Sequence, residues 1–310
     1  MKIVVTGATG LVGARFSNLL KDKYEIIPLA TSLGINITSP SAVETFILDN
    51  KPDVILHFAA KADVDGCEKD KHEDLSLLNE QNFDAKTFPV ENIINEDWEG
   101  GVSAFAINVA GTKNLAEAAR EINAKFIYIS TDFVFSGDNR EGFEENDEVS
   151  PINWYGATKY LGERIVMQTV SDYIIARISS PYGVKSEGKK DFIWKFVEFL
   201  STKEEIFCVE NQIITPTFID DVVMGIDFLL DKNESGIWHI VGSSFISPFE
   251  IGQKVKAAFS LTARINGVKA EDFFKDRAPR PYHSRVKNVK ISELGFVPKT
   301  FDEGLSLISK

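Results

Sequence analysis

The sequence predicts an α/β fold, a Rossmann-type doubly wound parallel sheet with a smaller C-terminal α/β substrate lobe. Three observations predict it. Short β-branched segments alternate with amphipathic segments over residues 1–178, as in a parallel sheet covered by helices. A glycine-rich turn follows the first of these segments. Beyond residue 178 the alternation becomes less regular, which indicates a second region of different build.

The core elements follow from periodicity and from end signals. Residues 2–6 read as the first strand, and an amphipathic helix follows the glycine turn as far as Leu20. A helix over 41–48 has Ser39 as its expected N-cap and Pro40 at its first helical position. Strands are expected at 25–29, 53–58, 125–130 and 173–178, with helices at 105–121 and 154–170.

The chain divides into two predicted regions. Residues 1–178 form the sheet core, with a polar, acidic insertion at 69–104 that is either a lid, an oligomer contact or plain surface elaboration. Residues 179–310 are mainly the substrate lobe, and the chain is expected to return to the core near 210–245. In this half helices are expected at 192–200, 219–231 and 248–259, with strands at 206–209 and 237–241.

Composition and charge exclude several classes of protein. The 310 residues carry 34 Lys and Arg against 46 Asp and Glu, a formal charge of −12 that disfavours nucleic acid and anionic membranes as partners. With no signal peptide and no apolar run of membrane-spanning length, the cytoplasm is the expected location. The two cysteines, Cys67 and Cys208, lack metal-ligand spacing, so free thiols and no metal site are expected.

The glycine-rich turn predicts a dinucleotide site. Gly7 permits the tight turn, Gly10 lets backbone approach a pyrophosphate, and Gly13 allows the helix to pack closely on the strand. The helix N-terminus offers free N–H groups to the anion. Any tight strand-to-helix turn needs glycines, but the place after an N-terminal strand favours cofactor binding. The expected contact residues are Gly7, Thr9, Gly10, Leu11, Val12 and Gly13.

The end of the second strand bears on which dinucleotide is bound. NAD-specific sites usually place Asp or Glu there to bind the ribose 2′-hydroxyl. Here the sequence reads Leu29-Ala30-Thr31-Ser32, without a carboxylate that would repel a 2′-phosphate. The hydroxyls of Thr31 and Ser32 are suited to bind that phosphate, although no arginine is evident nearby. The pattern therefore favours NADPH and leaves NADH as the alternative.

Tyr155 and Lys159 predict proton-transfer chemistry. They lie four residues apart near the start of the predicted helix, and thus on one face. A phenol with the ordinary pKa of about 10 shuttles protons poorly at neutral pH, and a nearby ammonium lowers that pKa. Thr131 ends the strand 125–130, at the sheet edge where such folds place ligands. It is expected to hold a substrate oxygen beside Tyr155, or, as the structural alternative, to cap the next turn.

These motifs resemble the extended short-chain dehydrogenase/reductases, and within them the dTDP-4-dehydrorhamnose reductase family. The resemblance runs nearly from end to end of the chain. It is carried by Gly7 to Gly13, Lys51-Pro52-Asp53 through Ala60, Val64-Asp65 with Glu68, Asn108 to Leu115, Ser130 to Gly137, Tyr155 to Lys159, Arg177 with Tyr182-Gly183, Asn211-Gln212 with Pro216-Thr217, and Arg280-Pro281 with Ser284.

The resemblance implies NADPH-dependent reduction of the C4 ketone of a nucleotide-linked deoxyhexulose. Tyr155 would give the proton, Lys159 would hold the nicotinamide ribose and tune Tyr155, and Thr131 would orient the carbonyl. Asn36 and Ile37 fall where the family contacts adenine. The resemblance also implies a homodimer. It places Ala59, Ala60 and Lys61 beside the cofactor, and Gln212, Thr217 and Arg280 on the sugar-nucleotide side, with Arg280 facing the diphosphate.

The departures from the family pattern lie mainly on the substrate side. The family's Ala-Ala-Tyr-Thr is Ala59-Ala60-Lys61-Ala62 here, and Ser180 replaces a tryptophan expected near the substrate. The family's Asp-Gln-x-Gly-x-Pro-Thr is Asn211 to Thr217, without the glycine. The reaction is therefore more firmly predicted than the substrate.

Two alternatives stay open from the sequence. One is an NAD-linked sugar-nucleotide epimerase or dehydratase with the same fold and residues. Dehydratases usually place an Asp-Glu pair after the active-site threonine, whereas Asp132-Phe133 follows Thr131 here. The other is a regulatory subunit that binds dinucleotide without turnover, which the intact Thr131, Tyr155 and Lys159 disfavour.

Overall fold

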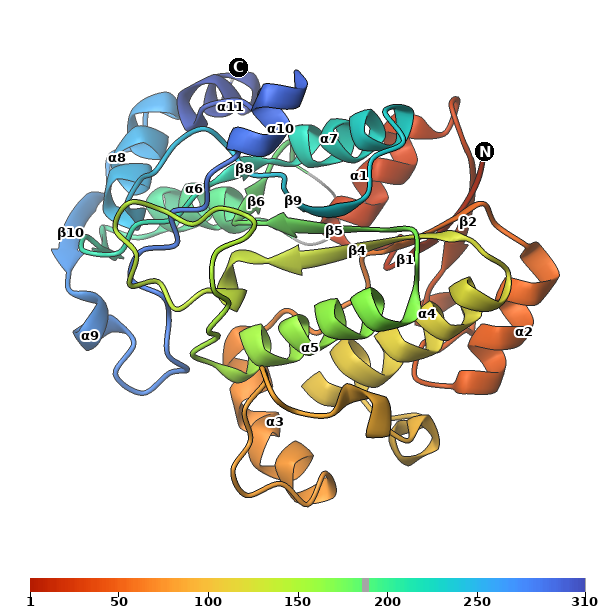
Figure 1. Cartoon of the computed structure of the whole chain (residues 1–310). Helices are drawn as coiled ribbons and strands as arrows, with labels where there is room; N and C mark the ends of the chain where they lie inside the picture. The colour runs from red at the N-terminus through yellow and green to blue at the C-terminus, as the bar shows by residue number, and fades with distance from the viewer. Residues whose placement is uncertain (186–189, 310) are drawn as a thin grey trace. The chain divides into compact units, whose positions relative to one another are not determined.

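The computed structural model describes residues 1–185 and 190–309, which form two compact units (Figure 1). The first unit comprises Met1–Val134, Val149–Ala176 and Glu234–Ile237; the second comprises Phe135–Glu148, Arg177–Asn233 and Trp238–Lys310. The main crossing between them falls at residues 176 and 177. The sequence pattern does not predict that residues 135–148 belong to the second unit, because this loop has no periodic apolar residues.

The first unit is built on a six-stranded sheet in the order β2-β1-β3-β4-β5-β9. The pairs β1–β2, β1–β3 and β3–β4 are parallel, as predicted for a doubly wound sheet. Helix α1 lies on one face, whereas α2, α4 and α5 cover the other (Figure 1). The strands are β1 Lys2–Thr6, β2 Glu25–Leu29, β3 Val54–His57, β4 Lys125–Thr131, β5 Tyr173–Ile178 and β9 Gly236–His239. The helices are α1 Leu11–Leu20, α2 Pro40–Asn50, α3 Val64–Leu77, α4 Gly111–Glu121 and α5 Trp154–Thr169.

Two helix beginnings differ in detail from the prediction. Ser39 is the N-cap residue of α2, but its hydroxyl donates to Glu99 Oε1 at 2.6 Å instead of accepting from the helix. The predicted helix 105–121 starts with a π-helical turn, Ala106–Ala110, before α4 continues it. Such turns hold one extra residue and occur frequently at functional sites.

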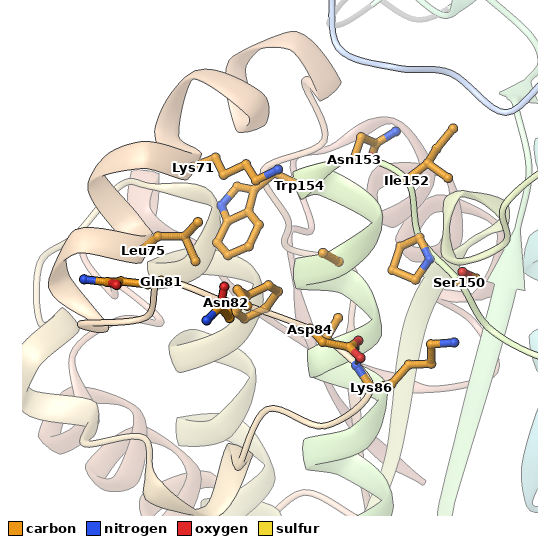
Figure 2. Close-up of a pocket in the computed structure, with 14 residues that line it drawn as sticks. Lys71, Leu75, Gln81, Asn82, Asp84, Lys86, Ser150, Ile152, Asn153 and Trp154 are labelled. Atoms are coloured by element: carbon orange, nitrogen blue, oxygen red, sulfur yellow. Dashed lines mark hydrogen bonds between the residues drawn. The ribbon is translucent and has the colours of Figure 1, made fainter.

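The predicted insertion 69–104 is partly a regular helix. Helix α3 runs to Leu77, and irregular chain with two 3-10 turns follows it. Residues 81–86 form one wall of a pocket of about 430 Å³, and residues 150–154 at the start of α5 form another (Figure 2). Within the first unit, the segment packs into the core through the buried side chains of Ala85, Phe88, Val90, Ile93 and Trp98.

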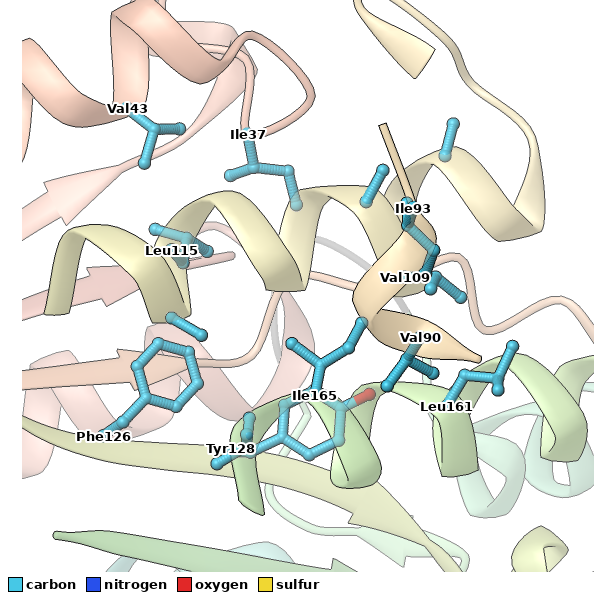
Figure 3. Packing of buried hydrophobic residues seen from close by; sticks show 14 of the residues in the cluster. Ile37, Val43, Val90, Ile93, Val109, Leu115, Phe126, Tyr128, Leu161 and Ile165 are labelled. Carbon is cyan, nitrogen blue, oxygen red and sulfur yellow. The ribbon is translucent and has the colours of Figure 1, made fainter. Parts of the chain in front are cut away.

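The core of the first unit explains the place of β4 and α5. Every residue of β4 is buried. Phe126 and Tyr128 of β4 belong to one apolar cluster with Leu115 of α4 and with Leu161 and Ile165 of α5 (Figure 3). Because this packing holds α5 against the sheet, it fixes where the side chains near the start of α5 lie relative to the end of β4.

The second unit contains two short parallel strand pairs, β7–β10 and β6–β8. Its strands are β6 Pro181–Tyr182, β7 Glu205–Val209, β8 Thr217–Phe218 and β10 Arg264–Val268. Its helices are α6 Phe192–Thr202, α7 Ile219–Asp231, α8 Pro248–Ala258, α9 Ala270–Phe273, α10 Val289–Leu294 and α11 Phe301–Ile308. None of the helices described in either unit is long and apolar enough to cross a membrane.

Candidate active site

The glycine turn between β1 and α1 has the shape of a dinucleotide cradle. Gly7 has φ +64°, and a Cβ there would lie 2.7 Å from the Ala59 nitrogen. A Cβ on Gly13 would lie 2.4 Å from the Gly7 oxygen. Gly10 is the N-cap residue of α1, so no side chain of its own covers the first-turn N–H groups. These groups are thus available to an anion, and the turn fits the pyrophosphate of a dinucleotide.

The end of β2 leads to the residues predicted for the adenosine end. Thr31 and Ser32 are exposed in a 3-10 turn that follows the strand. Asn36 is half-buried, and its Oδ1 accepts from the Thr38 nitrogen at 3.1 Å. Ile37 is buried, and its carbonyl oxygen accepts from Asn114 at 2.9 Å. The hydroxyls of Thr31 and Ser32 therefore face solvent, where a 2′-phosphate could reach them.

The loop after β3 is held by its main chain. Thr6 Oγ1 accepts from the Ala59 nitrogen at 3.1 Å, and Ala60 is half-buried. The Asn108 side chain, in the π-helical turn, bonds both the nitrogen and the oxygen of Lys61, at 2.9 and 3.1 Å. Asn108 also donates to Thr158 of α5 at 3.0 Å. Asn108 thus joins this loop to the helix that bears Tyr155, and its only sequence signal was its place in a motif of the family resemblance.

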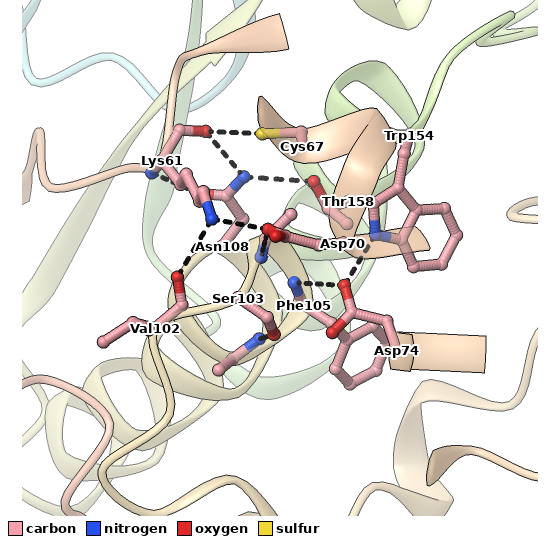
Figure 4. Close-up of polar contacts among 12 residues, drawn as sticks. Lys61, Cys67, Asp70, Asp74, Val102, Ser103, Phe105, Asn108, Trp154 and Thr158 are labelled. Atoms are coloured by element: carbon pink, nitrogen blue, oxygen red, sulfur yellow. Dashed lines mark hydrogen bonds and ion pairs between the residues drawn. The ribbon is translucent and has the colours of Figure 1, made fainter. Parts of the chain in front are cut away.

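The Lys61 ammonium is engaged away from this main chain. It forms an ion pair with Asp70 of α3 at 2.6 Å and donates to the Val102 oxygen at 3.2 Å (Figure 4). Asp70 also accepts from the Ala104 nitrogen at 2.8 Å. The Lys61 side chain, which departs from the family pattern, therefore joins α3 to the end of the irregular segment, so only the backbone of Lys61 is left to contact a cofactor.

Thr131 and Tyr155 meet at the carboxyl end of β4. Thr131 is the last residue of the strand, Tyr155 is the second residue of α5, and their side chains share a hydrogen bond. Thr131 Oγ1 also contacts Asp132 Oδ1 at 3.1 Å and accepts from the Phe133 nitrogen at 3.3 Å. Thr131 therefore combines both expected roles, since it caps the next turn and stands beside the phenol.

Lys159 lies one turn along α5, buried, with its Nζ 4.0 Å from the centre of the Tyr128 ring. Burial lowers the pKa of Lys159 to about 7, and the charge of Glu163 opposes that change. Burial raises the pKa of Tyr155 above its ordinary value, opposed by the hydrogen bond with Thr131. The prediction that the Tyr155 pKa is brought toward neutral pH is therefore wrong for the chain by itself, because desolvation of the phenolate dominates.

Two carboxylates of α3 fix the beginning of α5. Glu68 Oε2 accepts from the Trp154 nitrogen at 2.7 Å, and Asp74 Oδ2 accepts from the Trp154 indole N–H at 2.7 Å. Figure 4 shows Asp74 between the Trp154 indole and the Phe105 nitrogen. Asn153 caps the helix by accepting from the Gly156 nitrogen at 2.8 Å. Tyr155 is thus held in place by the hydrogen bonds that its neighbours Trp154 and Gly156 donate. Of the residues that hold the start of α5, only Glu68 belongs to the motifs that carry the family resemblance.

The predicted substrate residues lie in the second unit, where 211–217 runs beside 280–286. Ile213 and His283 form a parallel bridge. Gln212 is buried and donates to the Pro281 oxygen at 2.8 Å. Thr217 is fully buried, and its hydroxyl accepts from the Gly242 nitrogen at 3.1 Å. These contacts use both side chains within the fold.

Arg280 differs from Gln212 and Thr217 in being only half-buried. Its Nη1 donates to the Ala278 oxygen at 2.6 Å, and its guanidinium lies 5.4 Å from the centre of the Phe274 ring. A guanidinium carries several N–H donors in a planar fork, a geometry that matches a diphosphate. Among the predicted substrate residues, Arg280 therefore has the geometry best suited to a diphosphate contact.

Other features of the structure offer weaker candidate sites. The pocket of Figure 2 is not lined by Thr131, Tyr155 or Lys159. Within the residues that the structure describes, no group of three or more His, Cys, Asp or Glu side chains is arranged to hold a metal ion. Cys67 and Cys208 are buried free thiols. Glu145 is buried and accepts from the His239 nitrogen at 3.0 Å.

The parallel sheet, the glycine turn and the group formed by Thr131, Tyr155 and Lys159 define an extended short-chain dehydrogenase/reductase. The family model of the RmlD substrate binding domain matches residues 1–84 and 99–310. The chain belongs to this family, the dTDP-4-dehydrorhamnose reductase family of NAD(P)-dependent oxidoreductases. Residues 85–98 lie outside the match.

Individual proteins resemble the chain over almost its full length. The crystal structure of dTDP-4-dehydrorhamnose reductase from Bacillus anthracis in complex with NADP is 30% identical, covers 99% of this chain and 98% of its own, and has a TM-score of 0.84. The spore coat polysaccharide biosynthesis protein SpsK of Bacillus subtilis is 28% identical over 98% of this chain and 95% of its own. The dTDP-4-dehydrorhamnose reductase of Mycolicibacterium smegmatis is 26% identical over 96% of this chain and 81% of its own.

Proposed function

We propose that the protein reduces the C4 ketone of a nucleotide-linked deoxyhexulose with NADPH. The observation that carries this proposal is the hydrogen-bonded pair of Thr131 and Tyr155 at the carboxyl end of β4, with Lys159 one helical turn away. Relatives named as dTDP-4-dehydrorhamnose reductases support the substrate class. The family resemblance further supports a homodimer that works in the cytoplasm.

The proposed cofactor site follows the carboxyl ends of β1, β2 and β3. The turn from Gly7 to Gly13, including Thr9, Leu11 and Val12, would hold the pyrophosphate on the N-terminus of α1. The exposed hydroxyls of Thr31 and Ser32 would bind the 2′-phosphate of NADPH. The NADP complex of the Bacillus anthracis enzyme supports this choice over NADH. The remaining proposed contacts are Asn36 and Ile37 at the adenine, and Ala59, Ala60 and the backbone of Lys61 toward the nicotinamide.

The nicotinamide, when bound, supplies the hydride. The Thr131 hydroxyl would donate a hydrogen bond to the ketone oxygen, and the Tyr155 hydroxyl would give that oxygen its proton. Because burial raises its pKa, Tyr155 is protonated at neutral pH and ready to donate. The same burial makes the phenolate costly, so a charged Lys159 lowers the cost of that proton transfer. Lys159 would also hold the ribose hydroxyls.

The proposed substrate contacts lie on the second unit. Arg280 would bind the diphosphate through its guanidinium. The segment around Gln212 and Thr217 would present its backbone, since both side chains bond to main chain within the fold.

Turnover assays distinguish this function from the two alternatives. Purified protein is mixed with NADPH or NADH and a panel of 4-keto sugar nucleotides, and the absorbance of the reduced nicotinamide is followed. Oxidation in excess of the enzyme supports the reductase. Turnover without net oxidation, with cofactor that copurifies, identifies an epimerase or dehydratase. Cofactor binding without any turnover identifies a regulatory subunit.

Tyr155→Phe tests the proton donor. Loss of the phenolic hydroxyl should lower kcat by about 10²- to 10⁴-fold, the usual contribution of general acid catalysis, and leave NADPH affinity nearly unchanged. Affinity is measured by NADPH fluorescence. Tyr160→Phe, on the same helix and also half-buried, is the matched control and should keep full activity. A rate near that of the wild type for Tyr155→Phe would remove Tyr155 from the mechanism.

A further inference from the structure

A fully buried carboxylate lies on the face of α5 that bears the proposed catalytic residues. Tyr155, Lys159 and Glu163 follow one another at intervals of four residues, so they line one side of the helix. Glu163 has 0% of its surface exposed. Carboxylates are almost never buried to this extent unless other groups compensate their charge. The proposed mechanism assigns no role to Glu163, but the residues around Glu163 indicate one.

Glu163 connects α5 to the end of β4. Its Oε1 accepts from the Ser130 hydroxyl at 2.5 Å. Ser130 directly precedes Thr131, whose side chain bonds with Tyr155. A short bond of this kind is typical of a hydroxyl that donates to an ionised carboxylate. The carboxylate is therefore held at a defined position beside the proposed catalytic group.

Glu163 is also the negative charge among the titratable groups that face Lys159. These groups are Glu163 on the same helix, Cys67 of α3, Tyr128 of β4 and His57 of β3. Burial raises the pKa of Cys67 to about 12 and raises that of Tyr128, so both are neutral at pH 7. Burial and the Lys159 charge lower the pKa of His57, which is neutral as well. The charge that balances a buried Lys159 ammonium thus comes from Glu163.

We propose that Glu163 is a positioning residue that keeps Lys159 charged and seated beside Tyr155, with Ser130 holding the carboxylate in place. The catalytic consequence rests on the proposed function, whereas the effect on the lysine does not. Without the carboxylate, desolvation acts unopposed, and Lys159 loses its proton at a lower pH. A neutral Lys159 no longer stabilises the phenolate that forms when Tyr155 gives up its proton.

The direct test is the titration of the Lys159 amine in cofactor-free protein. Protein labelled with 15N-lysine is titrated by NMR of the Nζ nitrogen, and the resonance is assigned with Lys159→Arg. Glu163→Gln keeps the size of the side chain and its ability to accept from Ser130, so its expected effect is a midpoint lower by about one pH unit or more. Glu163→Asp keeps the charge and should restore most of that shift. A midpoint in Glu163→Gln equal to that of the wild type would overturn the proposal.

A stability cycle tests the same point without the NMR titration. Lys159→Met leaves the buried carboxylate without its counter-charge, so its thermal midpoint should fall below that of the wild type. Adding Glu163→Gln to Lys159→Met removes the uncompensated charge and should raise the midpoint again. Additive effects of the two substitutions would contradict the proposal.

The activity profile connects the charge to the reaction. In Glu163→Gln the alkaline limb of kcat should move to lower pH by the same interval as the NMR midpoint, with the KM for the sugar nucleotide unchanged. A fall in kcat that is equal at every pH would indicate only structural damage and refute the positioning role. If neither protein turns over any ketone but the Nζ midpoint still moves, the proposed function fails while the role of Glu163 stands.

Discussion

The two units hold their predicted site residues in different ways. In the first unit the side chains meet each other, as Thr131 and Tyr155 do through a hydrogen bond. In the second unit the buried side chains of Gln212 and Thr217 bond to main chain and shape the segment that carries them. The identity of individual side chains therefore decides the chemistry in the first unit. In the second, the path of the backbone decides what is offered to a ligand.

Gly13→Ala should give the largest loss of cofactor affinity, because the first unit has no room for a side chain at the glycine turn. A Cβ would lie 2.4 Å from the Gly7 oxygen, so the turn must shift. Overpacking typically costs 1–3 kcal/mol, which corresponds to a roughly 5- to 150-fold loss of NADPH affinity if the shift falls on the bound state. Affinity is measured by NADPH fluorescence. Gly10→Ala should also lose affinity, because the backbone there approaches the pyrophosphate, and wild-type affinity in either variant would contradict the cradle geometry.

Thr217→Val separates backbone shape from direct contact in the second unit. The buried Gly242 N–H would lose its acceptor, at a cost of about 1–3 kcal/mol in stability. The thermal midpoint should therefore fall, with a small change in the KM of the sugar nucleotide. Arg280→Ala should do the opposite, raising the KM and leaving the midpoint nearly unchanged. If Thr217→Val raises the KM without loss of stability, its hydroxyl contacts the substrate and the comparison of the two units fails.

Each unit buries one neutral histidine, and these two histidines should make the stability of the fold depend on pH. The expected effect is smaller than those above. Burial lowers the pKa of His239 to about 3 and also lowers that of His57. Below the ordinary histidine pKa of about 6.5 the unfolded chain binds protons that the folded chain does not. Each histidine should therefore remove up to about 1.4 kcal/mol of stability per pH unit as the pH falls from 6.5.

His239→Phe isolates the contribution of the second unit. Its ring already packs edge-on against Phe135, with 5.7 Å between ring centres. Its Nε2 has no hydrogen-bond partner within residues 1–185 and 190–309. Thermal midpoints at pH 7, 6 and 5 should show a shallower acid slope than the wild type. His57→Phe should cost more at pH 7, because both ring nitrogens of His57 bond to threonines. Parallel slopes for His239→Phe and the wild type would show that His239 does not titrate as inferred.

Local signals account for the elements that the sequence predicted well. The strand 2–6, the strand 125–130 and the helix 154–170 each agree with the structure to within one residue at either end. Each has a continuous apolar run or a clear helical period, and Gly7 and the cap Asn153 mark an end of the first strand and of the helix. Helix α3 was missed as a helix because it is mostly polar, with only Cys67 and Asp74 buried. It is held by hydrogen bonds that Asp70 and Asp74 accept from the backbone nitrogens of the distant residues 104 and 105.

The sequence by itself determined the positions that depend on neighbours along the chain. These are the glycines of the first turn and the helical phase that sets Tyr155 and Lys159 on one face. The tertiary structure decided the direction of the Tyr155 pKa and the engagement of the Lys61 ammonium by Asp70. The reason is that desolvation and charge pairing depend on groups brought close from distant parts of the chain, and local patterns carry no record of them.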